Sequence, residues 1–472
     1  MDKFYDVIVV GGGPAGAFFA YEMIQRNPNK KILLIERGKR VENRTCPETK
    51  LGKCVKCKPY CNITNGFSGA GAFSDGKLSL YNQDDDDFYI GGNLHKYIGV
   101  DTTKNLIDYT DEIYLKFGAT TKLEGVSNYS EVAKIKKTAE NVGLDLINIP
   151  IRHLGTDKAH DLYKKIENYL EDSGISFQFE SEVTDLIIEN NEIKGVKYRN
   201  KLGDIQDVNS DKVVIAVGRA GANWLLEMCK NYNIKSSPAA IDVGVRYELS
   251  DDVMANINEY LYEGKFVGKP NPFNDKVRTF CQNPSGFVSL EVYDGGLSLV
   301  NGHSCKEKKS KNTNLALLVS LGLRKMPDSM EYSRNIARNM NALADGNVLV
   351  QRLGDLKAGK RTWEAELKTN SVEPTLKSAK PGDISLGMPY RELTDILGFI
   401  ELMDKVAPGF ANPDNLIYAP ELKFYSNKID LSSNFETSVK GLHSIGDGCG
   451  LTRGLMMASA SGIQLARTIY TY

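Results

Sequence analysis

The stretch Val7-Ile8-Val9-Val10-Gly11-Gly12-Gly13-Pro14-Ala15-Gly16 decides the fold of this chain. Its four apolar residues, 7–10, predict a strand that is buried on both faces. Gly11, Gly13 and Gly16 then match the pattern G-x-G-x-x-G, in which the glycines permit a tight turn, a close approach to a pyrophosphate and close helix packing. Residues 17–26 predict a helix whose N-terminal amides would face that anion. The stretch therefore predicts a dinucleotide site.

A second apolar strand over residues 31–36 completes a βαβ opening. Its last residue, Glu36, lies 20 positions after Gly16, where an acidic side chain receives the ribose hydroxyls of a dinucleotide. An acid at this position favours a free 2′-hydroxyl, as in FAD or NAD, over a 2′-phosphate.

Two later segments favour FAD. Residues 213–218 are an apolar strand that ends in Ala216 and Gly218. Near the C-terminus, Gly446-Asp447 stands between a strand and a helix that opens at Gly454-Leu455. Such a carboxylate can accept a ribityl hydroxyl, and helix amides can stabilise negative charge on a reduced flavin.

Several further sequence motifs support the assignment of FAD, and they span nearly the whole chain. They are residues 69–78 (GAGAFSDGKL), 152–157 (RHLGTD), 301–304 (NGHS) and 423–426 (KFYS). With the glycine turn and the Gly446-Asp447 motif, they make the chain resemble flavoproteins of the glutathione-reductase type. More narrowly, it is similar to the uncharacterised bacterial FAD-dependent dehydrogenases, or NAD(P)/FAD-dependent oxidoreductases. Residues 281–286 depart from that family, which often has more cysteine and glycine there, so no role is carried over to Cys281.

The resemblance implies that Glu36 holds the adenosine ribose, that Arg37 and the backbone of Val183 lie by the adenine, and that the 69–77 loop passes near the isoalloxazine. The predicted FAD contacts are Gly11, Gly13, Pro14, Ala15, Gly16, Glu36, Arg37, Gly69, Ala70, Ser74, Lys77, Val183, Ala216, Gly218, Gly446, Asp447, Gly454 and Leu455.

Two cations are the catalytic candidates. Lys77 could stabilise an anionic reduced ring, and Arg453 could bind an anionic substrate or the flavin. A surface lysine and a helix-end ion pair are the alternative interpretations of the two. Further candidates are Arg246, His303 and Tyr425.

Four cysteines, Cys46, Cys54, Cys57 and Cys61, are spaced x7, x2 and x3. Four thiolates so close together could hold zinc or an iron–sulfur cluster. A redox-active disulfide and ordinary free thiols remain open as alternatives.

Composition narrows the class of protein. With 472 residues and a net charge of −1, the chain has no basic excess, so nucleic acid is not an expected partner. No signal peptide and no apolar run of membrane-spanning length is visible, which predicts a cytoplasmic protein with no membrane contact. The sequence does not indicate an oligomeric state.

The predicted fold is α/β: a doubly wound, Rossmann-type FAD-binding domain with an inserted α+β substrate domain. The FAD domain takes residues 1–104, including the cysteine-rich loop, with 151–234 and 416–472. Residues 105–150 are a connecting or inserted segment, and 235–415 form the substrate domain. Within that domain, residues 314–323 and 330–343 predict helices, and residues 243–249 and 287–292 predict strands.

The predicted reaction is hydride transfer through flavin N5 to or from a small molecule. NAD(P)H as a transient donor and an electron-carrier protein are the two routes considered for its electrons. A flavoprotein that modifies tRNA and a non-enzymatic FAD-fold binding protein are the alternative functions.

Overall fold

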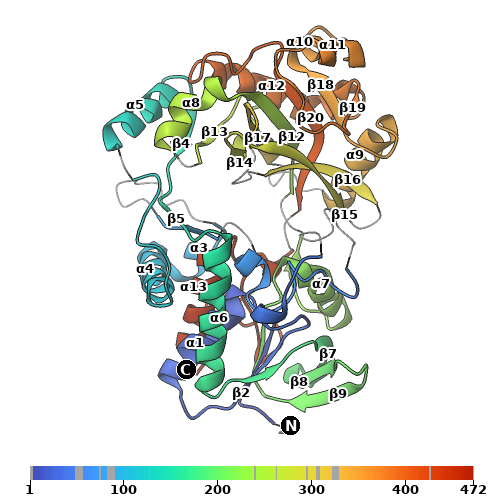
Figure 1. Ribbon diagram of the computed structural model, residues 1–472. Helices are drawn as coiled ribbons and strands as arrows, with labels where there is room; N and C mark the ends of the chain where they lie inside the picture. The colour runs from blue at the N-terminus through green and yellow to red at the C-terminus, as the bar shows by residue number, and fades with distance from the viewer. Residues whose placement is uncertain are drawn as a thin grey trace. The chain divides into compact units, whose positions relative to one another are not determined.

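The computed structural model describes residues 4–47, 57–73, 76–81, 91–126, 128–238, 241–261, 263–293, 296–303, 309–320, 329–424 and 427–470 (Figure 1). The chain forms two compact units. Unit 1 comprises Met1–Leu123, Ile149–Pro238 and Ser426–Tyr472, and unit 2 comprises Glu124–Asn148 and Ala239–Tyr425. Residues 105–123 thus belong to unit 1, while residues 124–148 and 416–425 belong to unit 2.

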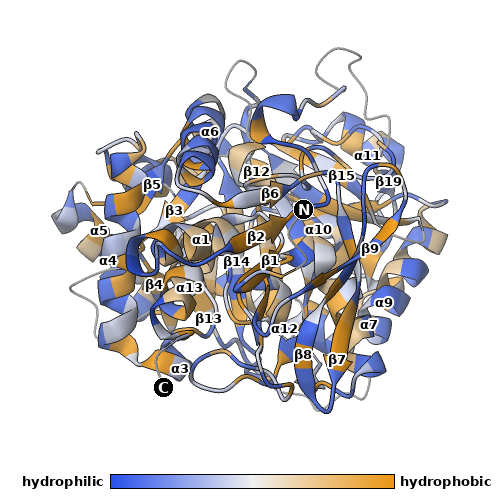
Figure 2. Ribbon diagram, turned by 90° about the horizontal axis from the view of Figure 1, so that it is seen from below, coloured by the Kyte–Doolittle hydropathy of each residue, from blue (hydrophilic) through white to orange (hydrophobic). Residues whose placement is uncertain are grey.

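Unit 1 is built on a five-stranded parallel sheet in the order β22-β10-β1-β2-β6. Its strands are β1 (Val7–Val10), β2 (Ile32–Ile35), β6 (Ser176–Gln178), β10 (Val213–Ile215) and β22 (Leu442–Ser444). Figure 2 shows β1 and β2 in hydrophobic colours, and all of their residues are buried. This sheet confirms the predicted Rossmann-type α/β fold.

Smaller elements complete unit 1. A three-stranded antiparallel sheet is formed by β7 (Glu182–Glu189), β8 (Glu192–Arg199) and β9 (Ile205–Asn209), and two pairs by β3 (Lys77–Ser79) with β5 (Ile151–His153) and β11 (Ser236–Ser237) with β21 (Lys428–Ile429). The helices are α1 (Pro14–Arg26), α3 (His95–Ile98), α4 (Val100–Lys116), α6 (Thr156–Asp172), α7 (Ala222–Asn231) and α13 (Leu455–Thr468). Short 3₁₀ turns are η1 (Val41–Asn43), η2 (Gly69–Phe73), η3 (Arg219–Gly221) and η5 (Asp447–Cys449).

Helices α1 and α13 pack closely although they come from opposite ends of the sequence. A Cβ atom at Gly462 of α13 would lie 2.2 Å from the carbonyl oxygen of Ala15 in α1. The absence of a side chain at residue 462 therefore sets the distance between the two helices.

Unit 2 contains an eight-stranded sheet in the order β19-β18-β20-β12-β17-β14-β13-β4. Its strands are β4 (Leu144–Ile147), β12 (Ile241–Ser250), β13 (Lys265–Gly268), β14 (Val277–Asn283), β17 (Asn312–Ser320), β18 (Leu349–Arg352), β19 (Lys380–Pro381) and β20 (Leu416–Phe424). A hairpin pairs β15 (Phe287–Tyr293) with β16 (Leu297–His303). The helices are α5 (Tyr129–Glu140), α8 (Asp251–Tyr260), α9 (Ser329–Leu343), α10 (Leu353–Lys357), α11 (Glu364–Lys368) and α12 (Tyr390–Asp404), with the 3₁₀ turn η4 (Ile384–Leu386).

The predicted helix over residues 314–323 is wrong for the described residues, because residues 312–320 form strand β17. This strand pairs with β12 on one side and β14 on the other, and every residue from 312 to 319 is buried. A strand covered on both faces has the same continuous apolar run as a buried helix, so the pattern alone could not separate them. The helix predicted over residues 330–343 is confirmed as α9.

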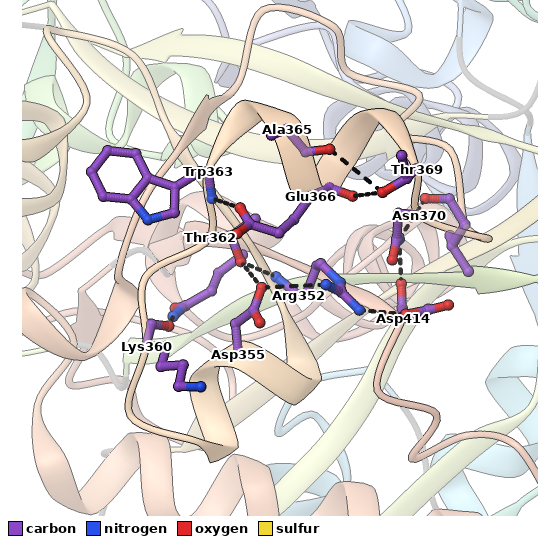
Figure 3. A network of polar contacts seen from close by, with 12 residues as sticks. Arg352, Asp355, Lys360, Thr362, Trp363, Ala365, Glu366, Thr369, Asn370 and Asp414 are labelled. Atoms are coloured by element: carbon purple, nitrogen blue, oxygen red, sulfur yellow. Dashed lines mark hydrogen bonds and ion pairs between the residues drawn. The ribbon is translucent and has the colours of Figure 1, made fainter.

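A polar network fixes the segment between β18 and α11 (Figure 3). Arg352 forms an ion pair with Asp414 at 2.6 Å, and its amide donates to the hydroxyl of Thr362 at 2.9 Å. Thr362 in turn donates to Asp355 at 2.7 Å. The network ties the segment before α11 to β18, and Trp363 at the start of α11 is exposed, with the Arg361 guanidinium 3.8 Å from its ring centre.

None of the helices among the described residues combines the length and the apolar character needed to cross a bilayer.

Candidate functional site

The glycine turn between β1 and α1 has the geometry that its sequence predicts. Gly11 has a φ of 104°, and a Cβ atom there would lie 2.5 Å from the carbonyl oxygen of Ala216. A Cβ atom at Gly16 would lie 2.1 Å from the carbonyl oxygen of Gly11. Around Gly13, by contrast, no atom outside residues 12–14 lies within 4 Å of the Cβ position. The first and third glycines thus serve packing, while the second leaves backbone open to a ligand.

Glu36 follows β2 and is buried beside this turn. Its Oε2 accepts the amide of Gly12 at 2.8 Å, and its Oε1 accepts the amides of Gly38 at 2.8 Å and Gly66 at 2.9 Å. An ionised carboxylate offers about four acceptor positions, so roughly one remains for a hydroxyl group. Glu36 therefore organises three loops as well as being placed to receive a ribose, and the sequence pattern indicated only the second role.

Arg37 connects β2 to two other segments. Its Nε donates to Asn65 Oδ1 at 2.6 Å, and its Nη2 donates to the carbonyl of Ala220 at 3.1 Å. The guanidinium lies 4.7 Å from the ring centre of Tyr60. Partial burial, followed by a hydrogen bond with Glu182, raises the pKa of Tyr60 to about 12. Since Val183 follows Glu182, the structure brings the two residues predicted at the adenine into one region.

Hydrogen bonds from Arg44 fix the loop that leads to Gly69. The sequence did not single out this arginine. Its side chain is 2% exposed and donates to the carbonyls of Asn62 at 2.8 Å, Ile63 at 2.7 Å and Gly69 at 2.6 Å, and also to Phe67. Burial lowers the pKa of Arg44 to about 10, which still leaves it charged at neutral pH. No periodic or motif signal distinguishes this arginine in the sequence.

The held loop lies directly against the glycine turn. The amide of Ser68 donates to the carbonyl of Gly12 at 2.7 Å, and the Cβ position of Gly69 is 3.7 Å from Gly13 Cα. Ala70 is exposed, and Ser74 lies outside the described residues. The start of the loop predicted to approach the flavin is therefore beside the predicted phosphate site.

Lys77 lies in β3, where it is the register partner of His153 in β5. Its neighbour Leu78 pairs with Arg152, whose guanidinium binds both oxygens of Asp111 at 2.7 and 2.6 Å. Two of the family phrases, residues 69–78 and 152–157, are thus adjacent in space. Lys77 is half-buried in this pair of strands.

The C-terminal motif lies next to the N-terminal turn. The Cβ position of Gly446 is 3.0 Å from Ala15 Cβ, and that of Gly448 is 2.6 Å from the carbonyl oxygen of Gly218. The residues around Gly218 and Gly454 leave both Cβ positions clear to 4 Å. Segments that are more than 400 residues apart therefore form one glycine-lined site.

Asp447 is fixed in this site by its own loop. Its Oδ1 accepts the hydroxyl of Thr452 at 2.8 Å, and its Oδ2 accepts the amide of Gly454 at 3.2 Å. Burial raises the pKa of Asp447, while the nearby charge of Arg219 and these hydrogen bonds oppose the rise. Arg219 was not among the predicted residues, although it directly follows Gly218 in the sequence.

Arg453 is exposed, and its backbone contacts the segment at residues 91–93. Its amide donates to the carbonyl of Gly91 at 3.1 Å, and the amide of Asn93 donates to the carbonyl of Leu451 at 2.8 Å. A Cβ atom at Gly91 would lie 2.1 Å from the carbonyl oxygen of Arg453. The double glycine at residues 91–92 was the signal for this contact. Leu455 begins α13 and is half-buried.

The cysteine cluster is only partly described. Cys46 and Cys57 are half-buried and Cys61 is exposed, while Cys54 lies outside the described residues. Among the residues that the structure describes, no three His, Cys, Asp or Glu side chains are gathered as a metal site would require. A zinc or iron–sulfur site at these cysteines stays a prediction.

Comparison with known proteins agrees with the motifs. Residues 243–423 match the family model described as "FAD-dependent protein, C-terminal domain-like". An uncharacterised protein of Clostridium beijerinckii is 24% identical, over 98% of this chain and 80% of its own length.

Solved structures with low similarity include a formate oxidase variant of Aspergillus oryzae and the L-proline dehydrogenase of P. horikoshii. The oxidase is 12% identical, with a TM-score of 0.44, over 99% of this chain and 98% of its own. The dehydrogenase is 13% identical, with a TM-score of 0.40, over 100% and 94%.

The residues of unit 1 fit FAD. They provide an open glycine turn at a helix N-terminus, a carboxylate with acceptor capacity for a ribose, and a second fixed carboxylate at Asp447. Unit 2 contains the whole of the matched family segment. The family-model match and the residues of unit 1 both point to FAD, and residues 243–423 are similar to the C-terminal domain of FAD-dependent proteins.

Proposed function

We propose that this chain is an FAD-dependent oxidoreductase that transfers hydride to or from a small molecule. The observation that supports this most directly is the meeting of two glycine motifs from opposite ends of the sequence, where a Cβ atom at Gly446 would lie 3.0 Å from Ala15 Cβ. When bound, FAD would supply the redox chemistry at flavin N5, and the protein supplies position and charge.

The roles of the protein's own groups follow from their placement. The amides at the start of α1 would bind the pyrophosphate, and Glu36 would accept a ribose hydroxyl. Asp447, held by Thr452 and Gly454, would accept a hydroxyl of the ribityl chain. Lys77 and Arg453 remain the proposed catalytic cations.

The electron donor is proposed to be NAD(P)H bound transiently or an electron-carrier protein. A cluster at Cys46, Cys54, Cys57 and Cys61 would suit the second route, since iron–sulfur clusters carry single electrons between proteins. Iron and zinc analysis of the purified protein distinguishes a redox cluster from a structural ion and from free thiols.

The decisive experiment is a visible spectrum of the purified protein, followed by anaerobic reduction. We expect flavin absorption bands, release of FAD on denaturation, and bleaching with NADH, NADPH or a reduced carrier. A protein that retains FAD but is neither reduced nor reoxidised by any donor or acceptor is a binding protein and not an oxidoreductase. Activity only with tRNA present would instead favour the tRNA-modifying alternative.

A further inference from the structure

Strand β12 presents charged residues on the face opposite its core. Ile241, Val243 and Val245 belong to the hydrophobic core of unit 2. The alternate residues Asp242 and Arg246 project to the other face, yet both are buried. A buried charge is expensive unless it is paired or bound. The partners of Arg246, which is 0% exposed, therefore decide what this face does.

Arg246 reaches three other segments of unit 2. Its Nε donates to Asn314 Oδ1 at 2.9 Å, its Nη2 donates to the carbonyl of Cys281 at 2.9 Å, and its Nη1 lies 3.4 Å from Glu421 Oε1. Lys423 Nζ lies 2.9 Å from the same oxygen of Glu421. We call Arg246, Asn314, Glu421 and Lys423 the Arg246 cluster.

Two irregularities of the sheet converge on this cluster. The pairing of β12 with β20 shifts register between Gly244 and Arg246. The pairing of β14 with β17 shifts register between Phe280 and Asn283, so the carbonyl of Cys281 turns toward the guanidinium. β-Bulges re-aim side chains and are over-represented beside binding sites. The two register shifts lie on both sides of Arg246, which favours a binding role for this residue over a purely structural ion pair.

The cluster has hydrogen-bonding capacity that the described residues do not meet. Asn314 Nδ2 and Glu421 Oε2 are fully buried and have no hydrogen-bond partner among them. Buried polar groups in folded proteins are nearly always paired. A group that pairs with both atoms would accept a hydrogen bond from the amide of Asn314 and donate one to the carboxylate of Glu421.

The net charge of the Arg246 cluster also limits which ligands it could bind. Arg246 and Lys423 carry two positive charges and Glu421 one negative charge, so the cluster is short of one anion. Lys423 is 15% exposed, while the other three members are not exposed, so a ligand would enter past the lysine. A ligand that fits the cluster is therefore small, carries one negative charge and has a hydrogen-bond donor.

We propose that the Arg246 cluster binds a small hydroxycarboxylate. Its carboxylate would pair with Arg246 and Lys423 and accept from Asn314, and its hydroxyl would donate to Glu421 Oε2. All of these residues belong to unit 2, so binding does not depend on FAD or on the proposed flavin chemistry.

The test is titration calorimetry of the purified full-length chain with glycolate. Acetate, which lacks the hydroxyl, and ethylene glycol, which lacks the carboxylate, are the comparison ligands. The variants R246Q, N314A and K423M each change one of the proposed ligand contacts: R246Q removes the guanidinium, N314A the amide and K423M the ammonium group. S320A is the matched control, because Ser320 lies on the same strand and face as Asn314. Circular dichroism establishes that each variant is folded.

We expect saturable binding of glycolate, with acetate and ethylene glycol at least about tenfold weaker. R246Q should weaken binding about 30-fold or more, and N314A and K423M by roughly tenfold, while S320A retains it. Since Lys423 is partly exposed, K423M gives a readout even where R246Q does not fold.

Absence of saturable glycolate binding overturns the proposal. Unchanged binding in folded K423M and N314A does the same, and it would leave ordered water as the partner of the two buried atoms. Because these measurements are made with and without bound FAD, their failure is distinct from failure of the proposed oxidoreductase function.

Discussion

The Cβ position of Gly302 lies 1.9 Å from Nη2 of Arg246 and 2.1 Å from Asn314 Oδ1. The β15–β16 hairpin can therefore close over the Arg246 cluster only because residue 302 has no side chain. The family phrase at residues 301–304 contains this glycine, which gives a physical reason for a residue that the sequence alone left unexplained.

G302A should displace the guanidinium of Arg246. Overpacking of this kind lowers the free energy of unfolding by about 1–3 kcal/mol, and glycolate binding should be lost with it. Chemical denaturation and titration calorimetry measure the two effects. Ser289, on the opposite strand of the same hairpin, provides the control S289A. Equal stability and equal glycolate binding in G302A and S289A would refute the steric clash at residue 302.

E36A should release FAD and also weaken the protein without FAD. The substitution leaves the amides of Gly12, Gly38 and Gly66 without their acceptor, and each unmet buried amide costs about 1–3 kcal/mol. Flavin content and urea unfolding of the FAD-free protein measure the two effects separately. E189Q, at an exposed glutamate of β7, is the control. A normal unfolding midpoint in FAD-free E36A would show that the three hydrogen bonds are not important for stability.

D447N should lower FAD affinity by roughly tenfold or more while the protein stays folded, because an amide cannot replace both acceptor oxygens of a carboxylate. Equilibrium dialysis against FAD gives the affinity, and D207N, at an exposed position of β9, is the comparison variant. Equal FAD affinity in the two variants would remove Asp447 from the cofactor site.

G462A should separate α13 from α1, because the new Cβ would lie 2.2 Å from the carbonyl of Ala15. We expect a loss of about 1–3 kcal/mol in the free energy of unfolding. FAD affinity should also fall, since Ala15 belongs to the glycine turn. Q464A on the same helix is the control, and a stability equal to that of Q464A would contradict the close-packing interpretation.

His443 should make stability depend on pH. Burial is the main cause that lowers its pKa to about 4, well below the ordinary value of 6.5. The unfolded chain therefore binds this proton more readily, so the stabilisation is complete above pH 6.5 and is lost as the pH falls from 6.5 to 4. The loss amounts to about 3 kcal/mol.

Urea unfolding at pH 7 and at pH 4.5 tests this dependence. H443Q should show a flatter pH profile than the natural chain, while H303Q, at an exposed histidine, should not change it. Parallel profiles for all three proteins would mean that His443 does not titrate as its burial requires.

The nucleotide-binding half of the fold could be predicted because its signals are local. Gly11, Gly13 and Gly16 must adopt one backbone geometry, and Glu36 follows at a fixed spacing. The Gly446-Asp447 motif is likewise short and lies between recognisable elements.

The remaining features could not be predicted because they depend on contacts between distant segments. Arg44 has no pattern around it, and only the folded loop reveals that it binds four carbonyls. The sequence of β17 predicts a helix, since burial on both faces removes the alternation that identifies a strand. Nothing in the sequence sets Arg246 apart from the other candidate residues, because its partners Asn314 and Glu421 come from distant segments.

The order of strands in unit 1 also has a consequence for biosynthesis. Strand β22 comes from residues 442–444 and pairs with β10, which the ribosome produced more than 200 residues earlier. A nascent chain would hold the phosphate turn early but could not complete the flavin pocket until residues 442–455 had emerged. We therefore expect stalled or truncated translation products to expose the unpaired edge of β10 and to depend on chaperones, whatever their FAD supply.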